Sequence, residues 1–527
     1  MKKRYLYYPL FLGIFFGLGI LLGNLLSVNG LDQEFTTNAN VKKRKLNRLI
    51  DIIDQRYVDQ VNTDSIVDVT VNGILQNLDP HSVYIPVSQA EAVADDMRGN
   101  FVGIGIRYYV NSDTISVLST VKNGPSQKAG IKSGDRILTV DGKLLYGENK
   151  VSTDELKGES GSKIILGVLK PGDKNPVDVP VTRGKIAIQS VDAAYKLTDK
   201  LGYIKVNRFA ESTVDEFNAA IDKLKKQGVQ QIAVDLRDNS GGVLQAAIEM
   251  ADEFLKDDQL ILFQKDRNNK RKNSYATSDG DFEDKSVFIL INENSASASE
   301  VVAGALQDND KGTIIGRRSF GKGLVQQEMQ LGDGSAIRLT VARYYTPTGR
   351  SIQRPYETGN EDYFNEYLER YENGELQNAS NIEVNDSLKF TTPGGKIVYG
   401  GGGIIPDVFV AGPNGYAQQT LDYFARTGFA DRTANNFLRS EGSFLRDMPK
   451  REFVDTYQVP ETLLLEFYQD ARRYNKSLRL TGNREYMLLL LKASLAEQLY
   501  GTELKVQLLN TQDSVIDRLL ELSQKVD

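Results

Sequence analysis

Apolar residues recur at helical spacing near the start of the chain and again toward its end. The segment VKKRKLNRLIDIIDQRYVD carries them on one face, and a second helix is expected over SIVDVTVNGILQNL. Farther along, ETLLLEFYQDARRY, REYMLLLLKASLAEQLYG and ELKVQLLNTQDSVIDRLLEL each carry an apolar stripe. The pattern predicts an N-terminal helical region over residues 40–96 and a C-terminal helical domain over residues 415–527.

Between these helical regions the apolar pattern changes twice. Short strands broken by Gly, Asp and Lys turns, such as DTISVLSTV, DRILTVDGKLL and SKIILGVLK, predict a β domain over residues 97–185. Residues 186–414 then alternate apolar strands with helical stretches, as in LGYIKV, TVDEFNAAIDKLKKQG and QIAVDLR, which indicates a layered α/β core. A polar, acid-rich insert over residues 355–395 interrupts this core, and we expect it to be a solvated loop or a surface helix.

Residues 1–30 contain a long apolar stretch that follows Lys2, Lys3 and Arg4. The stretch is long enough to cross a bilayer, which takes about 20 residues. Its basic flank should stay cytoplasmic, so the rest of the chain is expected in the periplasm or another extracytoplasmic space of the cell envelope. Because no small-x-small cleavage site follows, an uncleaved anchor in the inner membrane is favoured over a removed signal peptide.

Composition excludes several classes of function. At 527 residues the chain is expected to hold two to four domains. Its net charge of -6 argues against a nucleic-acid partner. The absence of cysteine excludes disulfides, thiolate metal sites and a cysteine nucleophile. We expect no cofactor and no metal, and the sole histidine, His81, is expected to make a structural hydrogen bond beside Pro80.

The run NENSASASE, residues 292–300, places a serine between a buried strand and a helix. Ser297 and Glu300 form an S-x-x-E capping box, which by itself explains a serine there. The same position lies beside free backbone N–H groups and the positive end of the helix dipole. Such groups can stabilise an oxyanion, so a nucleophilic role for Ser297 stays open at this point.

A base for that serine must come from elsewhere, and GRRSFGKGLVQQ offers one. Lys322 lies between two glycines, where the chain can bend sharply. Its pKa would have to fall by about three units from about 10.4, at a cost of about 4 kcal/mol, and burial can supply this. Ser–Lys pairs are a known variant of the catalytic triad. Gln326, four residues on, could orient the lysine.

The same stretch partly matches the pattern of a phosphate-binding loop, because Gly316, Gly321 and Lys322 fit G-x-x-x-x-G-K. However, Gly323 stands where the magnesium-binding Ser or Thr should be, and a strand is expected to follow in place of a helix. We therefore discount nucleotide binding.

A second glycine loop follows the strand QIAVDLR, in DNSGGVLQAA. Gly241 and Gly242 could supply one backbone N–H to an oxyanion, and Ala298 could supply the other. A simple tight turn is the alternative, as it is for most glycine pairs.

Residues 97–185 resemble a PDZ domain, through FVGIG and a GP…AGI…GD.I..VDG run that ends at Gly142. In that family the backbone N–H groups of the glycine loop bind a peptide's terminal carboxylate, while the peptide adds a strand to the sheet edge. The resemblance places this role on a loop of four residues, namely Val102, Gly103, Ile104 and Gly105. The alternative is a small β-barrel that binds no ligand.

Several motifs in order resemble the carboxyl-terminal processing, or tail-specific, proteases over residues 40–410. They are LDPHSVYIP, DLRDNSGG, NENSASASEVVAGALQD, RRSFGKGLVQQ, YYTPTGRSIQ and GGGIIPD. The resemblance implies an endopeptidase that engages a substrate's C-terminal tail. It implies that Ser297 is the nucleophile, Lys322 the general base and Gln326 the residue that orients the lysine.

One further match and two departures complete the comparison with this family. Asp308 matches another motif position, but about 16 Å of helix separates it from Ser297, so we expect a structural role. Asn294 stands where Gly is common in relatives. The helices beyond residue 415 lie outside the shared region.

The sequence thus predicts a multi-domain protein of α/β and β class: an anchor, a helical segment, a PDZ-like domain, a layered α/β protease core and a helical extension. The predicted function is a membrane-anchored serine endopeptidase with C-terminal tails as substrates. The alternative is a non-catalytic PDZ-bearing scaffold or adaptor of the envelope, which the presence of Ser297, Lys322 and Gln326 disfavours. A homo-oligomer formed through the C-terminal helices and a separate adaptor protein are further predicted partners.

Overall fold

The computed structural model describes residues 38–525 except 112–113, 146–151, 358, 413–419, 421–423, 425–426 and 477–483. The chain divides into two compact units, Met1–Leu78 and Asp79–Asp527. The anchor predicted over residues 1–30 lies outside the described residues. Among the residues that are described, no helix has both the length and the apolar character needed to cross a membrane.

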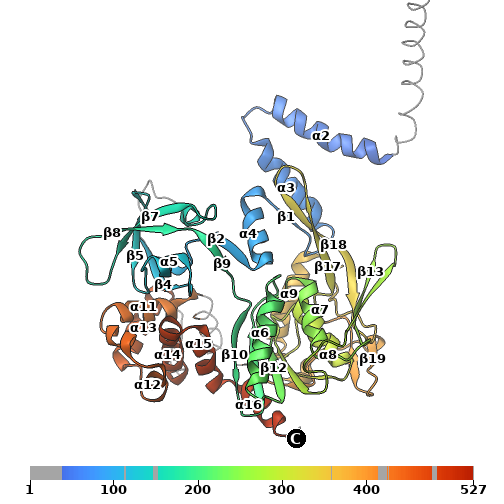
Figure 1. The fold of residues 1–527 in the computed structure, drawn as a ribbon. Helices are drawn as coiled ribbons and strands as arrows, with labels where there is room; N and C mark the ends of the chain where they lie inside the picture. Colours follow the sequence, from blue (N-terminus) through green and yellow to red (C-terminus); the bar gives the residue numbers. More distant parts are fainter. Residues whose placement is uncertain are drawn as a thin grey trace, which may run out of the picture. The chain divides into compact units, whose positions relative to one another are not determined.

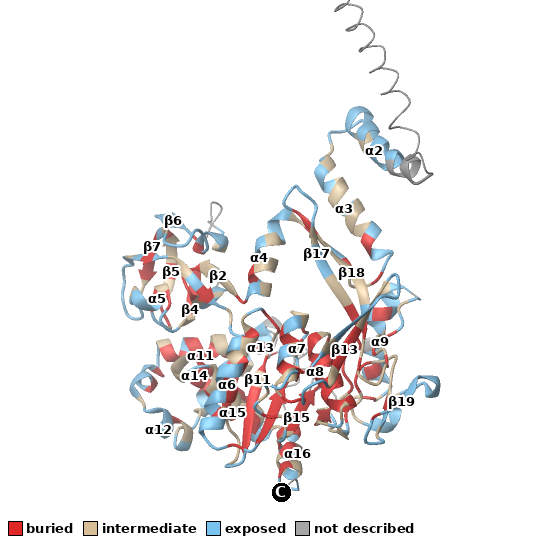
Figure 2. Cartoon of the chain, turned by 45° about the vertical axis from the view of Figure 1, so that its right-hand side comes forward, coloured by how far each residue is buried: buried red, intermediate tan, exposed pale blue. Residues whose placement is uncertain are grey.

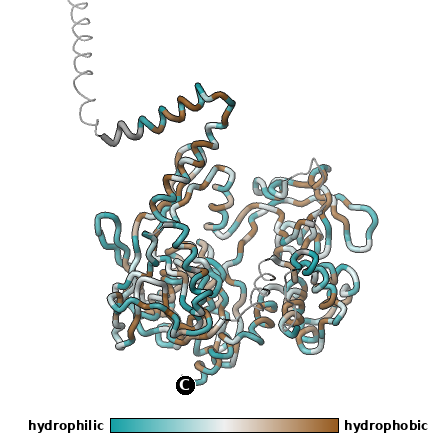
Figure 3. The backbone as a smooth tube through the Cα atoms, turned by 180° about the vertical axis from the view of Figure 1, so that it is seen from behind, coloured by the Kyte–Doolittle hydropathy of each residue, from teal (hydrophilic) through white to brown (hydrophobic). Residues whose placement is uncertain are grey.

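Within residues 38–78, the described part of the first unit, lie helices α2 (Asn38–Arg56) and α3 (Thr63–Gln76), along which apolar and polar residues alternate (Figure 3). Helix α3 begins where the Asn62 side chain accepts a hydrogen bond from the Ser65 N–H, as an N-cap residue does. The predicted helical region continues into the second unit, where α4 (Val87–Arg98) follows a short strand that the pattern had not indicated, β1 (Val83–Ile85).

The β domain is built on a six-stranded antiparallel sheet in the order β3-β4-β5-β7-β8, with β6 paired to β5 (Figure 1). Its strands are β3 (Ile106–Asn111), β4 (Thr114–Thr120), β5 (Arg136–Val140), β6 (Lys143–Leu144), β7 (Lys163–Leu169) and β8 (Val177–Thr182). A separate pair, β2 (Asn100–Gly103) and β9 (Gly184–Ala187), brings together the two ends of the domain. The short helix α5 (Pro125–Lys128) and the 3₁₀ turn η2 (Thr153–Leu156) complete it.

The predicted layered core is a six-stranded sheet in the order β10-β11-β12-β15-β16-β21, in which β10 alone is antiparallel to its neighbour. Its strands are β10 (Val191–Lys196), β11 (Leu201–Val206), β12 (Gln231–Asp235), β15 (Ser286–Ile291), β16 (Gly312–Gly316) and β21 (Val408–Phe409). Figure 2 shows these strands as the most buried part of the molecule.

Helices cover both faces of this sheet. Successive side chains along a strand point to opposite faces, so strands that are apolar at successive positions need cover on both. Ile232 and Val234 pack with helices α6 (Thr213–Lys226), α7 (Leu244–Asp252) and α8 (Ala298–Asp308). Ala233, between them, packs on the opposite face against the last helix, α16 (Ser514–Ser523). Parallel strands covered on both faces read as continuous apolar runs, which is why QIAVD and SVFILI are apolar at successive positions.

A second sheet, in the order β1-β18-β13-β14, carries a hairpin that begins two residues after the predicted base, Lys322. Strand β17 pairs with β18 in this hairpin, and the register shifts between Val325 and Gln326. The strands are β13 (Leu260–Asp266), β14 (Arg271–Tyr275), β17 (Leu324–Gln330) and β18 (Ala336–Tyr345).

The acid-rich insert contains helix α9 (Asn360–Glu372), followed by the hairpin β19 (Lys389–Thr391) and β20 (Ile397–Tyr399). Most of α9 is exposed, as a surface helix should be, but Tyr363 and Arg370 are each only 2% exposed. Farther along the insert, Glu375 (2% exposed) and Thr392 (3% exposed) are buried as well. The insert is therefore attached to the core by buried side chains, which a freely solvated loop would not have.

The C-terminal helices form a separate apolar cluster that is rich in Phe and Leu. They are α11 (Phe429–Arg439), α12 (Lys450–Asp455), α13 (Glu461–Tyr474), α14 (Arg484–Tyr500) and α15 (Thr502–Leu509). This domain also contacts the β domain, because Arg107 of β3 pairs with Glu497 of α14.

Candidate active site

The three serines of the SASAS run have different surroundings. Ser295 and Ser299 are fully buried, and their hydroxyl groups donate to the carbonyl oxygens of Leu236 (2.8 Å) and Asn239 (2.9 Å) in the loop after β12. Ser297 is partly exposed at the start of α8. Of the three serines, Ser297 is therefore the one that is not fully buried.

The backbone of Ser297 has an unusual conformation. Its φ is +54°, a region that residues other than glycine seldom adopt. Strained residues of this kind persist only when their surroundings fix them, and they cluster at functional sites.

Glu300 connects the serine turn to the loop that carries Lys322. Its carboxylate is completely buried and accepts four hydrogen bonds, from the Ser297 N–H (2.8 Å), the Lys322 N–H (2.8 Å), the Gly321 N–H (2.6 Å) and the Ser319 hydroxyl (2.6 Å). Burial raises the pKa of Glu300, while these four donors favour its charged form. The sequence predicted only the capping contact with Ser297; the three contacts with the lysine loop were missed.

Tyr344 makes a second bridge between the two residues. Its hydroxyl lies 3.3 Å from the carbonyl oxygen of Ser297 and 3.1 Å from that of Lys322. Tyr344 is 2% exposed, so both contacts are shielded from water. The structure therefore brings Ser297 and Lys322 together through two shared partners, although 25 positions separate them in the sequence.

The side chain of Lys322 has the surroundings that a neutral amine needs. Burial, and after it the positive charge of Arg338, lowers the pKa of Lys322 to about 8, against the opposing charges of Glu300 and Asp79. The lysine Nζ donates to Gln326 Oε1 at 2.8 Å. The predicted neighbour of the lysine, Gln326, is therefore in contact with it.

Asp308 lies at the far end of α8, away from this cluster. It is fully buried in an ion pair with Arg350 (2.7 Å), and its other oxygen accepts hydrogen bonds from the backbone N–H and hydroxyl of Thr348. These contacts give Asp308 a structural role.

The predicted oxyanion donors need one correction. The Gly241 N–H donates to Asn239 Oδ1 at 2.9 Å, so it is already engaged. Gly241 nevertheless packs closely on the serine turn, since a Cβ at this position would lie 2.8 Å from Ser297 Cβ. Ala298, the first residue of α8, has an N–H with no intrahelical partner. Gly242 and Ala298 remain the candidate donors.

The predicted carboxylate loop is divided between two environments. Val102 and Gly103 belong to β2 and pair with β9. Ile104 and Gly105 form the turn into β3 and line a cavity of about 190 Å³ with apolar neighbours that include Leu156. Strand β3 is the end strand of its sheet. Only Ile104 and Gly105 of the four predicted residues therefore face a site that could take a peptide.

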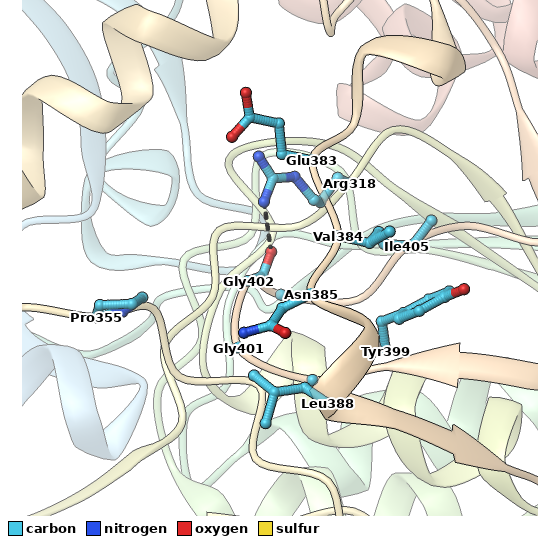
Figure 4. A pocket seen from close by; sticks show the side chains of 12 residues that line it. Arg318, Pro355, Glu383, Val384, Asn385, Leu388, Tyr399, Gly401, Gly402 and Ile405 are labelled. Carbon is cyan, nitrogen blue, oxygen red and sulfur yellow. Dashed lines mark hydrogen bonds between the residues drawn. The ribbon is translucent and has the colours of Figure 1, made fainter.

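Another cavity, of about 160 Å³, lies beside the insert (Figure 4). Arg318 lines it and donates to the carbonyl oxygen of Gly402 at 3.2 Å. None of the predicted catalytic residues lines this cavity, so it is separate from the Ser297 site.

The model for peptidase family S41 matches residues 200–359, and that for the PDZ domain matches residues 102–181. The chain is 36% identical over 353 residues to a carboxy-terminal-processing protease of Bartonella bacilliformis, which covers 64% of this chain and 80% of that protein. It is 31% identical over 317 residues to the carboxy-terminal processing protease CtpB of Bacillus subtilis, covering 59% and 65% of the two chains. Among solved structures, the photosystem II D1 C-terminal processing protease is 26% identical, with a TM-score of 0.36 over 70% of this chain and 93% of that one.

Proposed function

The chain belongs to the carboxy-terminal processing proteases of peptidase family S41, and from this premise we propose that it cuts substrate proteins through a Ser297–Lys322 dyad. The family predicted from the sequence motifs is confirmed, and with it a serine-type peptidase that has a PDZ domain. The observation that carries the dyad is the buried carboxylate of Glu300, which binds the backbone N–H groups of both residues.

In the proposed reaction, Ser297 Oγ attacks the scissile carbonyl while the neutral Lys322 amine takes the hydroxyl proton. The C–N bond then breaks, and the lysine gives that proton to the leaving amine. Water attacks the resulting acyl-enzyme with Lys322 again as base, which releases the acid and restores the serine. With a pKa of about 8 for Lys322, roughly a tenth of the molecules carry the neutral amine at pH 7.

Charge that develops on the substrate oxygen needs donors, and two are available next to the serine. The Ala298 N–H lies at the positive end of α8. Gly242 lies in the loop after β12, at the carboxyl end of the neighbouring strand. We assign the oxyanion site to these two backbone groups.

Substrate recognition is proposed to begin at the PDZ domain. A tail would add a strand to the free edge of β3 and place its carboxylate on the N–H groups of the Ile104–Gly105 turn. The apolar lining of the adjacent cavity favours an apolar final residue. The basic and apolar pattern of residues 1–30 supports anchoring in the membrane, with this machinery outside the cytoplasm.

A peptide with an apolar, free C-terminus tests the proposal. The unaltered protein should cleave it, and Ser297→Ala and Lys322→Ala should each abolish cleavage while the thermal unfolding curve is retained. Cleavage by either variant at the original rate would refute the dyad. Failure of the unaltered protein to cleave any such peptide would favour the non-catalytic scaffold.

A further inference from the structure

Helix α9 of the insert contacts the loop that carries the proposed base. Arg370 donates through Nη1 to the carbonyl oxygen of Ser319 (2.8 Å) and through Nη2 to that of Phe320 (3.4 Å). These two residues come directly before Gly321 and Lys322. The guanidinium is held in place by Glu366, one turn earlier on α9, at 2.9 Å. The insert therefore fixes the backbone from which the lysine extends.

The same helix reaches the other side of the lysine through Tyr363. Its hydroxyl lies 2.8 Å from Nε2 of His81, and both rings meet edge to face at 5.2 Å. The carbonyl oxygen of His81 accepts a hydrogen bond from Gln326 Nε2 at 2.5 Å. Gln326 Oε1 then accepts from Lys322 Nζ. A continuous chain of contacts thus connects the insert with the amine.

The His81 carbonyl decides which way the Gln326 amide points. A carbonyl oxygen can only accept a hydrogen bond, so it must face the NH₂ end of the amide, and the amide oxygen must then face the lysine. The turn that holds this carbonyl is rigid, because Asp79 accepts from the His81 N–H (2.9 Å) and from the Ser82 N–H (2.8 Å).

The His81 ring does not compete with the lysine for protons. Burial, and after it the charge of Lys322, lowers the pKa of His81 to about 3. The imidazole is therefore neutral at physiological pH, and its contact with the Tyr363 hydroxyl is a hydrogen bond between two uncharged groups.

We propose that helix α9 positions the general base. Arg370 fixes the loop that carries Lys322, and Tyr363, acting through His81, keeps the Gln326 amide oxygen turned toward the lysine Nζ. Both are positioning residues that do not touch the substrate. This inference rests on the proposed Ser–Lys mechanism, and it gives the acid-rich insert a role in catalysis.

Tyr363→Phe tests the proposal, because it removes one hydroxyl and keeps the ring. The hydroxyl that contacts His81 also bonds to the side chains of Arg354 and Gln353. We expect kcat for the free-tailed peptide to fall at least about fivefold, the size of one lost hydrogen bond, with KM changed less than twofold. The matched control is Tyr371→Phe, the same change on the same helix at a side chain that is 36% exposed. The control should leave kcat and KM unaltered.

A double-mutant cycle separates positioning from a general structural effect. If Tyr363 acts through Gln326, then Tyr363→Phe should cost nothing further in a Gln326→Ala background. The same fivefold loss in that background, or a loss in KM alone, would overturn the inference. Should Tyr363→Phe unfold the chain, Arg370→Lys keeps the charge and loses the forked donor. Because Arg370 acts on the lysine loop and not through Gln326, this variant should lower kcat, with KM changed less than twofold, in the Gln326→Ala background as well. An unchanged kcat in Arg370→Lys would overturn the inference. A failure of the unaltered protein to cleave the peptide would instead count against the proposed function.

Discussion

The nucleophile side and the base side of the site draw their supports from different parts of the chain. The turn of Ser297 is held by Ser295 and Ser299, whose hydroxyl groups bond to the loop after the neighbouring parallel strand at Leu236 and Asn239. All of these contacts lie inside one sheet and its connections. The nucleophile is therefore fixed by the same packing that makes the fold.

The base side is assembled from three separate segments. Lys322 bonds to Gln326 on a hairpin of the second sheet, Gln326 bonds to His81, which is 245 positions earlier, and His81 bonds to Tyr363 of the insert. These segments lie at the periphery of the core. The difference implies that losing a buried support of the serine turn lowers stability, whereas losing a contact on the base side alters the rate while the fold persists.

The largest expected effect is a loss of kcat on the serine side. Ser297→Ala should reduce kcat at least a thousandfold, because the nucleophile itself is lost. Ser295→Ala is the matched control two residues away. It should lower the free energy of unfolding by about 1–3 kcal/mol through a lost buried hydrogen bond, while cleavage at 25 °C persists. Peptide turnover and urea denaturation measure the two quantities. Equal loss of turnover in both variants would contradict the assignment of Ser297.

Glu300→Gln disturbs the group that holds both sides together. An amide of the same shape can accept on one end only, so two of the four donors lose their partner and the dyad is displaced. We expect kcat/KM to fall about a hundredfold, as a displacement of about 1 Å can cause. The negative charge of Glu300 also raises the pKa of Lys322, so its removal should lower that pKa.

The pH profile of that variant distinguishes a role in catalysis from a role in folding. Lys322 acts as a base only when neutral, so kcat/KM of the unaltered protein should rise with pH through about 8. We call this rising part of the pH profile the acid limb. In Glu300→Gln the acid limb should move to lower pH. A lower kcat/KM with the acid limb at the same pH would show that Glu300 has a structural role only.

Gln326→Glu should move the same limb in the opposite direction. A carboxylate next to Lys322 Nζ favours the charged amine and raises its pKa by about one unit. The raised pKa should cost roughly tenfold in kcat/KM at pH 7, a loss that narrows as the pH is raised above 9. A smaller loss should persist at every pH, because a carboxylate cannot donate to the His81 carbonyl oxygen. If the loss is the same at every pH, Gln326 does not act on the ionisation of the lysine.

The sequence could predict the serine side more fully than the base side. The strand, the turn and the helix around Ser297 follow one another in the chain, and the S-x-x-E spacing already placed Glu300 next to it. That Glu300 also binds Gly321 and Lys322 could not be predicted, because those contacts depend on how two loops meet in space. The same is true of His81, whose local turn with Asp79 is predictable from Asp-Pro but whose contact with Gln326 is not.

One misassignment had a signal in the sequence. Gly241 was assigned to the oxyanion site, yet Asn239 stands two residues before it, and Asn side chains commonly bind the backbone N–H two positions on.

The insert was expected to be a solvated loop or a surface helix, and helix α9 is such a surface helix. Within it, Tyr363 and Arg370 are seven positions apart on one helix, the spacing of residues that share a face, and this face is the one that is buried.

The last expected effect concerns the PDZ domain, which belongs to neither side. Amidation of the peptide's C-terminus removes the charge that the Ile104–Gly105 turn is proposed to bind, and kcat/KM should fall about tenfold, since hydrogen bonds to a charged group are worth about 1.5–3 kcal/mol. The acid limb should stay where it is, because the PDZ domain takes no part in the ionisation of Lys322. Parallel pH profiles for free and amidated peptides measure both quantities. A shift of the acid limb on amidation would mean that binding of the tail changes the pKa of Lys322. The contacts of His81 and Gln326 would then be the first candidates for transmitting that change.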